Sequence, residues 1–348
     1  MNTDTIQQTK HDQQVARWLF IVAFTIFLMM ILGAVTRLTH SGLSMVDWKP
    51  LMGILPPLSD ADWAQTFQRY QEFPEYQKIN HQMNLEGFKS IYYFEYFHRI
   101  LGRLIGMMFL LPFIYFWFKG AIRKSHLPQM MLMFILGGLQ GVLGWYMVKS
   151  GLVNDPHVSQ YRLTAHLIAA VIIYSYILWF AFGLIKDKSL AAINPYSSRL
   201  FKYAIGMIVL VVLMITSGGF VAGTKAGLAY NTFPLMDGKL IPDGLNQLQP
   251  FWLNWLENTT SIQFNHRILA YILIILIPLF SMAVRKQGQT KNSQKASTAF
   301  VVMLAIQVTL GITTLLYFVP VTIAASHQAG AIILLTISIY ICRELKQE

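Results

Sequence analysis

The sequence predicts an all-α integral membrane protein with eight transmembrane helices, arranged as two parallel repeats of a four-helix bundle. Three observations predict this fold. Of 348 residues, 55% are hydrophobic and only 12% are charged, which is far from the composition of soluble domains. Uncharged apolar runs long enough to cross a bilayer recur along the chain. Related motifs also appear in the same order in both halves.

The eight helices are predicted from apolar runs close to the roughly 20 residues that cross about 30 Å of hydrocarbon. In the first half these runs lie at 18–36, 104–118 (extended back to about 97), 129–148 and 164–185. In the second half they lie at 203–222, 267–284, 299–319 and 322–342. The predicted domains are an N-terminal half at 18–185 and a C-terminal half at 203–342, with a linker at 186–202 and tails at 1–17 and 343–348.

The net charge is +11, and the positions of the basic residues along the chain indicate membrane topology rather than nucleic-acid binding. Lysine and arginine concentrate in alternate connections and in both tails, although the opposite connections are much longer. By the positive-inside rule both termini are cytoplasmic. The first helix is too long for a secretory signal, and the segment before it contains Asp4 and Asp12 with one lysine, unlike a transit peptide. We therefore expect a multi-pass protein of the bacterial cytoplasmic (inner) membrane.

The lone cysteine, Cys342, lies at the predicted cytoplasmic end of the last helix. One cysteine excludes an intrachain disulfide. The expected role of Cys342 is that of a packed apolar thiol.

Motifs repeated between the halves support their relationship. "FEYFHRILG" at 94–102 returns as "IQFNHRILA" at 262–270, and "GAVTRLTHSGLSMVDWKPLMG" from Gly33 resembles "GGFVAGTKAGLAYNTFPLMDG" from Gly218. "LQGVLG" at 139 pairs with "IQVTLG" at 306, and "LTAHLIAA" at 163 pairs with "AASHQAGA" at 324. Because four helices per half is an even number, both halves enter the membrane in the same orientation, so the repeats are parallel.

Four of the nine histidines fall within the first turns of predicted helices two, four, six and eight. They are His98, His166, His266 and His327. All four helices run inward, so the imidazoles should lie at similar depth near the outer face. One intramembrane histidine alone often only bonds a neighbouring helix. Four at equivalent positions favour two pairs of axial ligands to haem iron; zinc or copper would usually require carboxylate or thiolate ligands as well.

Small residues follow each histidine by one turn, on the same helix face. They are Gly102, Ala169, Ala170, Ala270, Gly330 and Ala331. Such positions could admit a porphyrin edge, or could serve ordinary helix contacts. Arg99 and Arg267, adjacent to two of the histidines, could bind haem propionates or could extend to the lipid headgroups.

The motifs "EYFHRILGR", "TAHL", "NHRILA" and "SHQA", with the two glycine-rich segments from Gly33 and Gly218, resemble those of the haem A synthase family from about residue 17 to 342. That family oxidises a ring methyl of haem O to a formyl group, giving haem A for the terminal oxidase. The resemblance implies that His266 and His327 hold a haem B cofactor. It also implies that His98 and His166 form the substrate site for haem O.

The two histidine motifs differ in charge at one position, which is Glu95 in the first motif and Gln263 in the second. Each lies three residues before its histidine, hence on the same helix face. Given the resemblance, a carboxyl at Glu95 could relay protons or stabilise positive charge at the oxidised carbon, and a permanent electron-transfer haem would need neither. The alternative is that Glu95 only pairs with Arg99 or Arg103.

The first outer loop, predicted at 37–96, lacks the cysteine pair that some bacterial members carry, so the chain looks like the proteobacterial and mitochondrial branch. Its Trp48, Trp63 and tyrosines are expected to anchor the loop at the membrane interface and cover the substrate site. No flavin, nicotinamide or iron–sulfur motif is present, which leaves the electron donor external. Haem O synthase and the cytochrome oxidase assembly machinery are the expected partners.

Two other functions remain open on the sequence. A di-haem electron carrier of the cytochrome b kind explains four histidines equally well, but leaves the difference between Glu95 and Gln263 unexplained. A haem transporter or chaperone would fit a labile haem in the first half, and leaves the second pair without a role.

Overall fold

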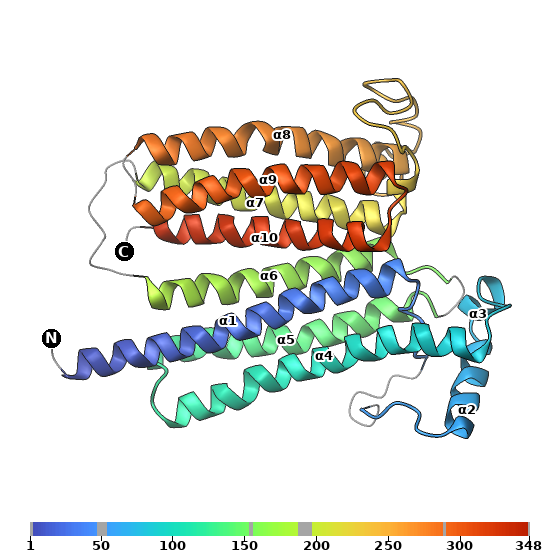
Figure 1. Ribbon diagram of the computed structural model, residues 1–348, viewed down its shortest axis with the longest axis horizontal. Coiled ribbons are helices and arrows are strands. Elements are labelled where there is room, and N and C mark those ends of the chain that lie inside the picture. The colour runs from blue at the N-terminus through green and yellow to red at the C-terminus, as the bar shows by residue number, and fades with distance from the viewer. Residues whose placement is uncertain (1–2, 47–53, 153–155, 187–196, 288–289, 347–348) are drawn as a thin grey trace.

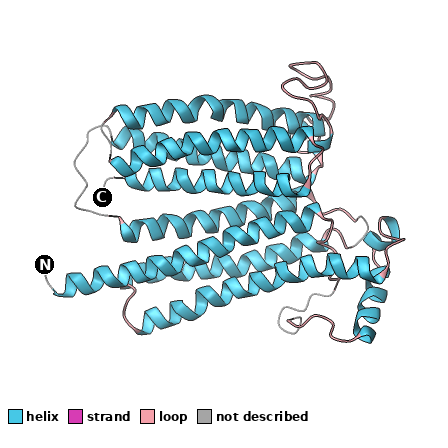
Figure 2. Ribbon diagram, in the orientation of Figure 1, coloured by secondary structure: helices cyan, strands magenta, loops and turns pink. Residues whose placement is uncertain are grey.

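A computed structural model describes residues 3–46, 54–152, 156–186, 197–287 and 290–346, and these residues form helices and loops without a strand (Figure 2). Eight of the helices are long and apolar enough to cross a membrane, as predicted. They are α1 Thr3–Leu38, α4 Leu85–Phe118, α5 Leu127–Lys149, α6 Gln160–Ile185, α7 Ser197–Gly223, α8 Thr259–Lys286, α9 Lys291–Leu316 and α10 Val321–Leu345. The shorter elements are α2 Asp60–Gln71, α3 Pro74–Lys78 and the 3-10 turns η1 Lys124–His126, η3 Ala226–Leu228 and η4 Phe251–Trp255.

The long helices form two groups, α1 with α4 to α6 and α7 to α10 (Figure 1). The groups meet where α6 packs on α7 and α10, and where α1 packs on α10. Gln328 donates to the Met30 carbonyl at 2.9 Å, and the hydroxyls of Tyr174 and Thr336 lie 2.7 Å apart. Both termini lie at the same end of the helices (Figure 1), as an even number of crossings requires.

Glycines bring α6 and α7 into close contact at this junction. A methyl group placed on Gly223 would lie 2.8 Å from Cα of Gln160, and one on Gly219 would lie 2.9 Å from the hydroxyl oxygen of Thr164. Neither position leaves room for a side chain. Small residues allow helix backbones to approach in a membrane, where packing rather than the hydrophobic effect drives association.

The segment between α1 and α4, called the outer segment after its predicted side of the membrane, is more helical than the predicted loop at 37–96, because it contains α2, α3 and the first turns of α4. The side chain of Asn84 accepts a hydrogen bond from Gly87 N at 2.9 Å and starts α4 well before the apolar run. Ser59 and Asp62 form a capping box that starts α2. Polar and aromatic residues therefore extend the helices beyond the stretch that hydropathy alone marks.

Trp63 packs inward rather than lying in the lipid interface. It is 6% exposed and contacts Phe88 and Tyr92, which together with Tyr70 form the buried aromatic cluster between α2 and α4. The prediction that Trp63 anchors the loop in the interface is wrong, because its ring is used to attach α2 to α4. Trp48, which was given the same role, lies outside the described residues.

Glu75, a buried acid on α3 next to this cluster, makes the stability of the outer segment depend on pH. Glu75 is 4% exposed and accepts a hydrogen bond from the Tyr70 hydroxyl at 3.0 Å, while Asn80 donates to the same hydroxyl at 2.8 Å. Burial raises the pKa of Glu75 to about 7, although the Tyr70 bond acts in the opposite direction. The folded segment therefore binds a proton more tightly than the unfolded one, so its stability is greatest at low pH and decreases as pH rises toward 7.

We expect the outer segment to open more readily at pH 8 than at pH 5.5 in the wild type, and Glu75→Gln to remove the difference. The measurement is the rate of limited proteolysis of residues 54–84, expressed at each pH as the ratio of wild type to Glu75→Gln. That ratio cancels the pH dependence of the protease itself. An identical ratio at both pH values would show that Glu75 does not change its protonation over this range.

Candidate haem-binding site

The two histidines of the N-terminal half lie on α4 and α6, two helices that both pack against α1 and α5. Each ring packs against a glycine of a neighbouring helix. A methyl group on Gly33 of α1 would lie 3.0 Å from Cε1 of His98, and one on Gly144 of α5 would lie 3.1 Å from Cε1 of His166. His98 was expected in the first turns of its helix. It lies instead about three to four turns after Leu85, because α4 begins before the predicted start near 97.

The C-terminal half repeats this arrangement on α8 and α10. His266 and His327 lie on helices that both pack against α7 and α9. A methyl group on Gly218 of α7 would lie 3.5 Å from Cε1 of His266, and one on Gly311 of α9 would lie 2.8 Å from Cε1 of His327. Each histidine helix therefore has a partner helix with a glycine facing the imidazole.

Two glutamines complete the repeated contacts, and sequence reasoning missed both. Gln140 Nε2 donates to the carbonyl of His166 at 2.8 Å, and Gln307 Nε2 donates to the carbonyl of His327 at 2.9 Å. The signal was present in "LQGVLG" and "IQVTLG", where a glutamine precedes the glycine by four residues in both halves. On a helix that spacing places both on one face, so the pair could have been assigned to contacts with the histidine helix.

All four imidazoles are partly buried. Nδ1 is buried and unbonded in His98, His166 and His327, whereas Nδ1 of His266 lies 3.1 Å from Ser217 Oγ. Nε2 of each ring is not among the buried atoms that lack a partner, and no hydrogen bond to Nε2 is present among the described residues. Imidazole nitrogens without a protein partner, two rings in each half, have the donor chemistry of axial haem ligands. The residues present therefore fit haem.

Glu95 is 3% exposed, and both of its carboxylate oxygens are hydrogen-bonded. Oε1 accepts from the Arg99 guanidinium, at 2.6 Å from the terminal nitrogen and 3.2 Å from Nε. Oε2 accepts from Ser44 Oγ at 2.7 Å and from Met45 N at 2.8 Å. The pairing with Arg99 that the sequence left as an alternative is thus present, and the carboxylate is surrounded by donors.

Gln263 has a different environment in the second half. It is 3% exposed, and its Nε2 donates to the Tyr230 carbonyl at 3.1 Å, while its Oε1 is buried without a partner. Arg267 also donates to the Tyr230 carbonyl, at 3.2 Å, as Arg99 donates to that of Met45 at 2.7 Å. Arg99 and Arg267 thus each bond a loop carbonyl. Only Arg99 also has a carboxylate beside it, because Gln263 stands where the first half has Glu95.

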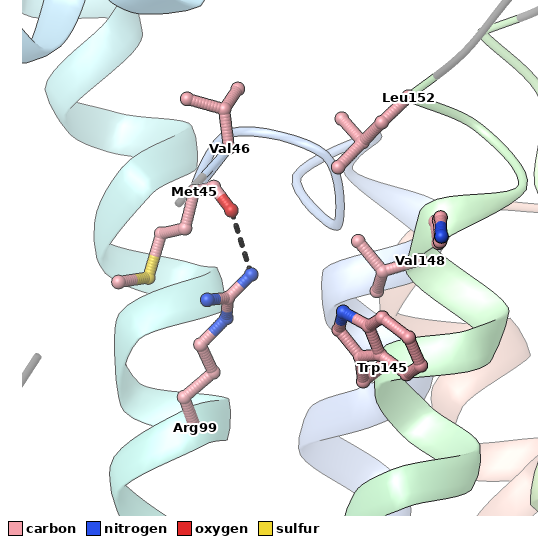
Figure 3. Close-up of a pocket in the computed structure, with 7 residues that line it drawn as sticks. Met45, Val46, Arg99, Trp145, Val148 and Leu152 are labelled. Carbon is pink, nitrogen blue, oxygen red and sulfur yellow. Dashed lines mark hydrogen bonds between the residues drawn. The ribbon is translucent and has the colours of Figure 1, made fainter. Parts of the chain in front are cut away.

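A cavity of about 170 Å³ lies between α4 and α5, and Arg99, the residue after His98, lines it (Figure 3). Arg99 faces Trp145 across it (Figure 3), and Nζ of Lys149 lies 5.2 Å from the centre of a Trp145 ring. The remaining lining residues are Met45, Val46, Val148 and Leu152. Since the charge of Arg99 is balanced by Glu95, Lys149 gives this apolar cavity a net positive wall.

The small residues one turn inward do not all leave open space. Gly102 is exposed, with only the Met29 methyl near a Cβ position, at 3.4 Å. Gly330 is buried, and a methyl group there would overlap the Gln307 side chain and lie 3.1 Å from the Met303 methyl. The expectation of a porphyrin-accepting groove is wrong at Gly330, because α9 already occupies that space.

Comparison with known proteins agrees with the resemblance seen in the motifs. Residues 16–339 match the family COX15-CtaA, described as cytochrome oxidase assembly protein. The heme A synthase of Nitrosospira multiformis is 47% identical over 354 residues, covering 100% of this chain and 99% of that protein. Those of Nitrosomonas eutropha (45% identical; 97% of this chain, 95% of that protein) and Parvibaculum lavamentivorans (42%; 94% and 92%) are also similar.

A family match across nearly the whole chain, together with full-length relatives at 42 to 47% identity, shows that the chain belongs to the cytochrome oxidase assembly protein family COX15-CtaA.

Proposed function

We propose that this chain is a haem A synthase, which oxidises a methyl group on the ring of haem O to a formyl group. The observation that carries the proposal is a difference between two otherwise matched histidine sites. The first has the buried Glu95 carboxylate and the cavity beside Arg99, and the second has Gln263 and no carboxylate. Two electron-transfer haems would not need this difference, whereas one reacting haem and one retained haem would.

The C-terminal pair, His266 and His327, is proposed to hold a permanent haem B, whose iron supplies redox chemistry when bound. The hydroxyl of Ser217 lies 3.1 Å from Nδ1 of His266, and an outer hydrogen bond of this kind fixes the orientation of a ligating imidazole. In the first repeat, the residue before Gly33 is Leu32, which offers His98 no such bond. This difference supports tighter haem retention in the second half.

Ser217→Ala is expected to weaken haem B binding by about 10-fold or more, because loss of an outer partner of a ligating histidine typically costs that much. The measurement is the rate at which haem B passes from the purified protein to apomyoglobin. Ser217→Thr, which keeps the hydroxyl, is the matched control and should transfer haem at the wild-type rate. Equal transfer rates for wild type and Ser217→Ala would contradict the proposed support of His266.

The N-terminal pair, His98 and His166, is proposed to bind haem O as substrate. Lys149, in the wall of the cavity next to Arg99, is proposed to bind a propionate of haem O, and Arg99 is proposed to do so beside its ion pair with Glu95. Arg267 is proposed to do the same for haem B. Glu95, on the same face as His98, is proposed to act on the substrate by holding negative charge near the reacting carbon or by accepting a proton from it.

The closely matched surroundings of the two histidine pairs favour one rival, a di-haem electron carrier. Extracting and separating the pigments of cells that make haem O, with and without this chain, distinguishes the two. Haem A formed only when the chain is present supports the synthase. Unchanged haem O, with two haem B molecules on the purified chain, would support the carrier.

The chain is proposed to reside in a bacterial inner membrane with both termini in the cytoplasm, receiving haem O from haem O synthase and electrons from an external donor. In a Cys342→Ser background, Leu240→Cys should react with an impermeant thiol reagent on intact cells, since Leu240 is 78% exposed in an outer loop. Ser198→Cys, at the opposite end of α7, should not react. The reverse pattern would invert the topology.

A further inference from the structure

The two halves also differ at the loop position that lies next to Glu95 in the first half and next to Gln263 in the second. In the aligned segments from Gly33 and Gly218, Ser44 corresponds to Ala229 and Met45 to Tyr230. The structure supports this register, because Arg99 bonds the Met45 carbonyl and Arg267 bonds the Tyr230 carbonyl. Where the first half has a serine facing a glutamate, the second therefore has an alanine near a glutamine.

Ser44 is placed to hold the Glu95 carboxylate. Its side chain is 1% exposed, and its Oγ lies 2.7 Å from Glu95 Oε2. The same hydroxyl is 3.0 Å from the Ser41 carbonyl and 3.4 Å from that of Ile91. A hydroxyl has one proton to donate, and the shortest contact is the one to a charged acceptor, which makes the strongest bond.

Together with Met45 N, Ser44 fixes Oε2, while Arg99 fixes Oε1. These contacts come from two sides, the loop after α1 and the next turn of α4, so the carboxylate cannot rotate without losing a bond. The loop is held in turn, because Arg99 also bonds the Met45 carbonyl at 2.7 Å. Ala229 could not make the equivalent side-chain bond, and Gln263 carries no charge to receive it.

We propose that Ser44 is a positioning residue for the oxidation, acting through Glu95 by keeping its carboxylate aimed at the substrate beside His98. The proposal rests on the proposed function. Ser44 does not touch the substrate in this account, and its hydroxyl neither gains nor loses a bond during the reaction. Its contribution should therefore vanish when the carboxylate is absent.

A double-mutant cycle tests this dependence. Ser44→Ala is expected to lower haem A formed per bound haem B by about 10- to 100-fold, the range corresponding to loss of one hydrogen bond to a charged group. In a Glu95→Gln background the same change should cost less than about twofold. The double variant recreates the alanine and glutamine of the second half, a combination that this fold already accommodates. Ser41→Ala is the matched control: Ser41 is fully buried in the same turn, but its hydroxyl bonds Thr39.

Independent losses that multiply in the double variant would overturn the proposal, because they would give Ser44 a role separate from Glu95. A ratio in Ser44→Ala equal to wild type, or a loss equal to that of Ser41→Ala, would also overturn it. Because haem A is measured per haem B bound, poor folding lowers the yield without changing the ratio. If the wild type itself made no haem A, the proposed function would fail; a normal wild type with an unaffected Ser44→Ala variant would reject only this inference.

Discussion

Glu95→Gln is expected to fold, insert and retain haem B, yet to form haem A about 100- to 10,000-fold more slowly, the typical cost of removing one positioned acid or base. The structure adds a reason beyond lost charge. Every group bonded to the Glu95 carboxylate is a donor, from Arg99, Ser44 and Met45. A glutamine amide would direct its own NH2 group at one of them, whereas Gln263 directs its NH2 at the Tyr230 carbonyl.

The measurement for this variant is haem A per bound haem B in purified protein supplied with haem O. Glu86→Gln is the control, since Glu86 lies on the same helix and pairs with Lys89 at the surface. Haem O or a partly oxidised product should accumulate in Glu95→Gln alone. A ratio near that of the wild type would show that the ion pair with Arg99 is structural only.

Substitution of the four histidines is expected to divide them into two unequal pairs. His266→Ala or His327→Ala should remove the low-spin haem B spectrum, because one remaining imidazole cannot supply both axial ligands. His98→Ala or His166→Ala should leave most of that spectrum and abolish haem A. The two classes should differ qualitatively, since one loses the cofactor and the other loses the substrate site.

Absorbance and paramagnetic resonance spectra of the four purified variants, normalised to protein, are the measurement. The four variants are comparable in kind, because each one removes an imidazole that lies near a glycine of a neighbouring helix. Equal loss of haem B from all four variants would contradict the division and favour a symmetric di-haem carrier.

Sequence patterns predicted the eight long helices because crossing a bilayer requires an uninterrupted apolar run, and composition reports such runs directly. The ends of the helices were harder to predict from the sequence. α4 begins at Leu85 rather than near 97 because Asn84 caps it and an aromatic cluster covers its first turns. Those contacts join residues that are distant in sequence, and hydropathy does not register them. Trp63 was misassigned for the same reason.

The candidate site was predicted in part. The four histidines were predicted as site residues because they repeat within similar motifs, and Glu95 because its counterpart is Gln263; their roles stay predictions. The supporting residues were missed. Ser44, Gln140 and Ser217 each make a hydrogen bond to a residue of another helix, and a polar side chain in an apolar segment has many possible partners. Only the folded arrangement shows which partner each one has.

The most direct test of the whole account is the haem content of the purified chain before and after incubation with haem O and a reductant in air. The account predicts one retained haem B per chain throughout, and a second, exchangeable haem that begins as haem O and is recovered as haem A. Two retained haem B molecules per chain, with haem O recovered unchanged, would contradict it.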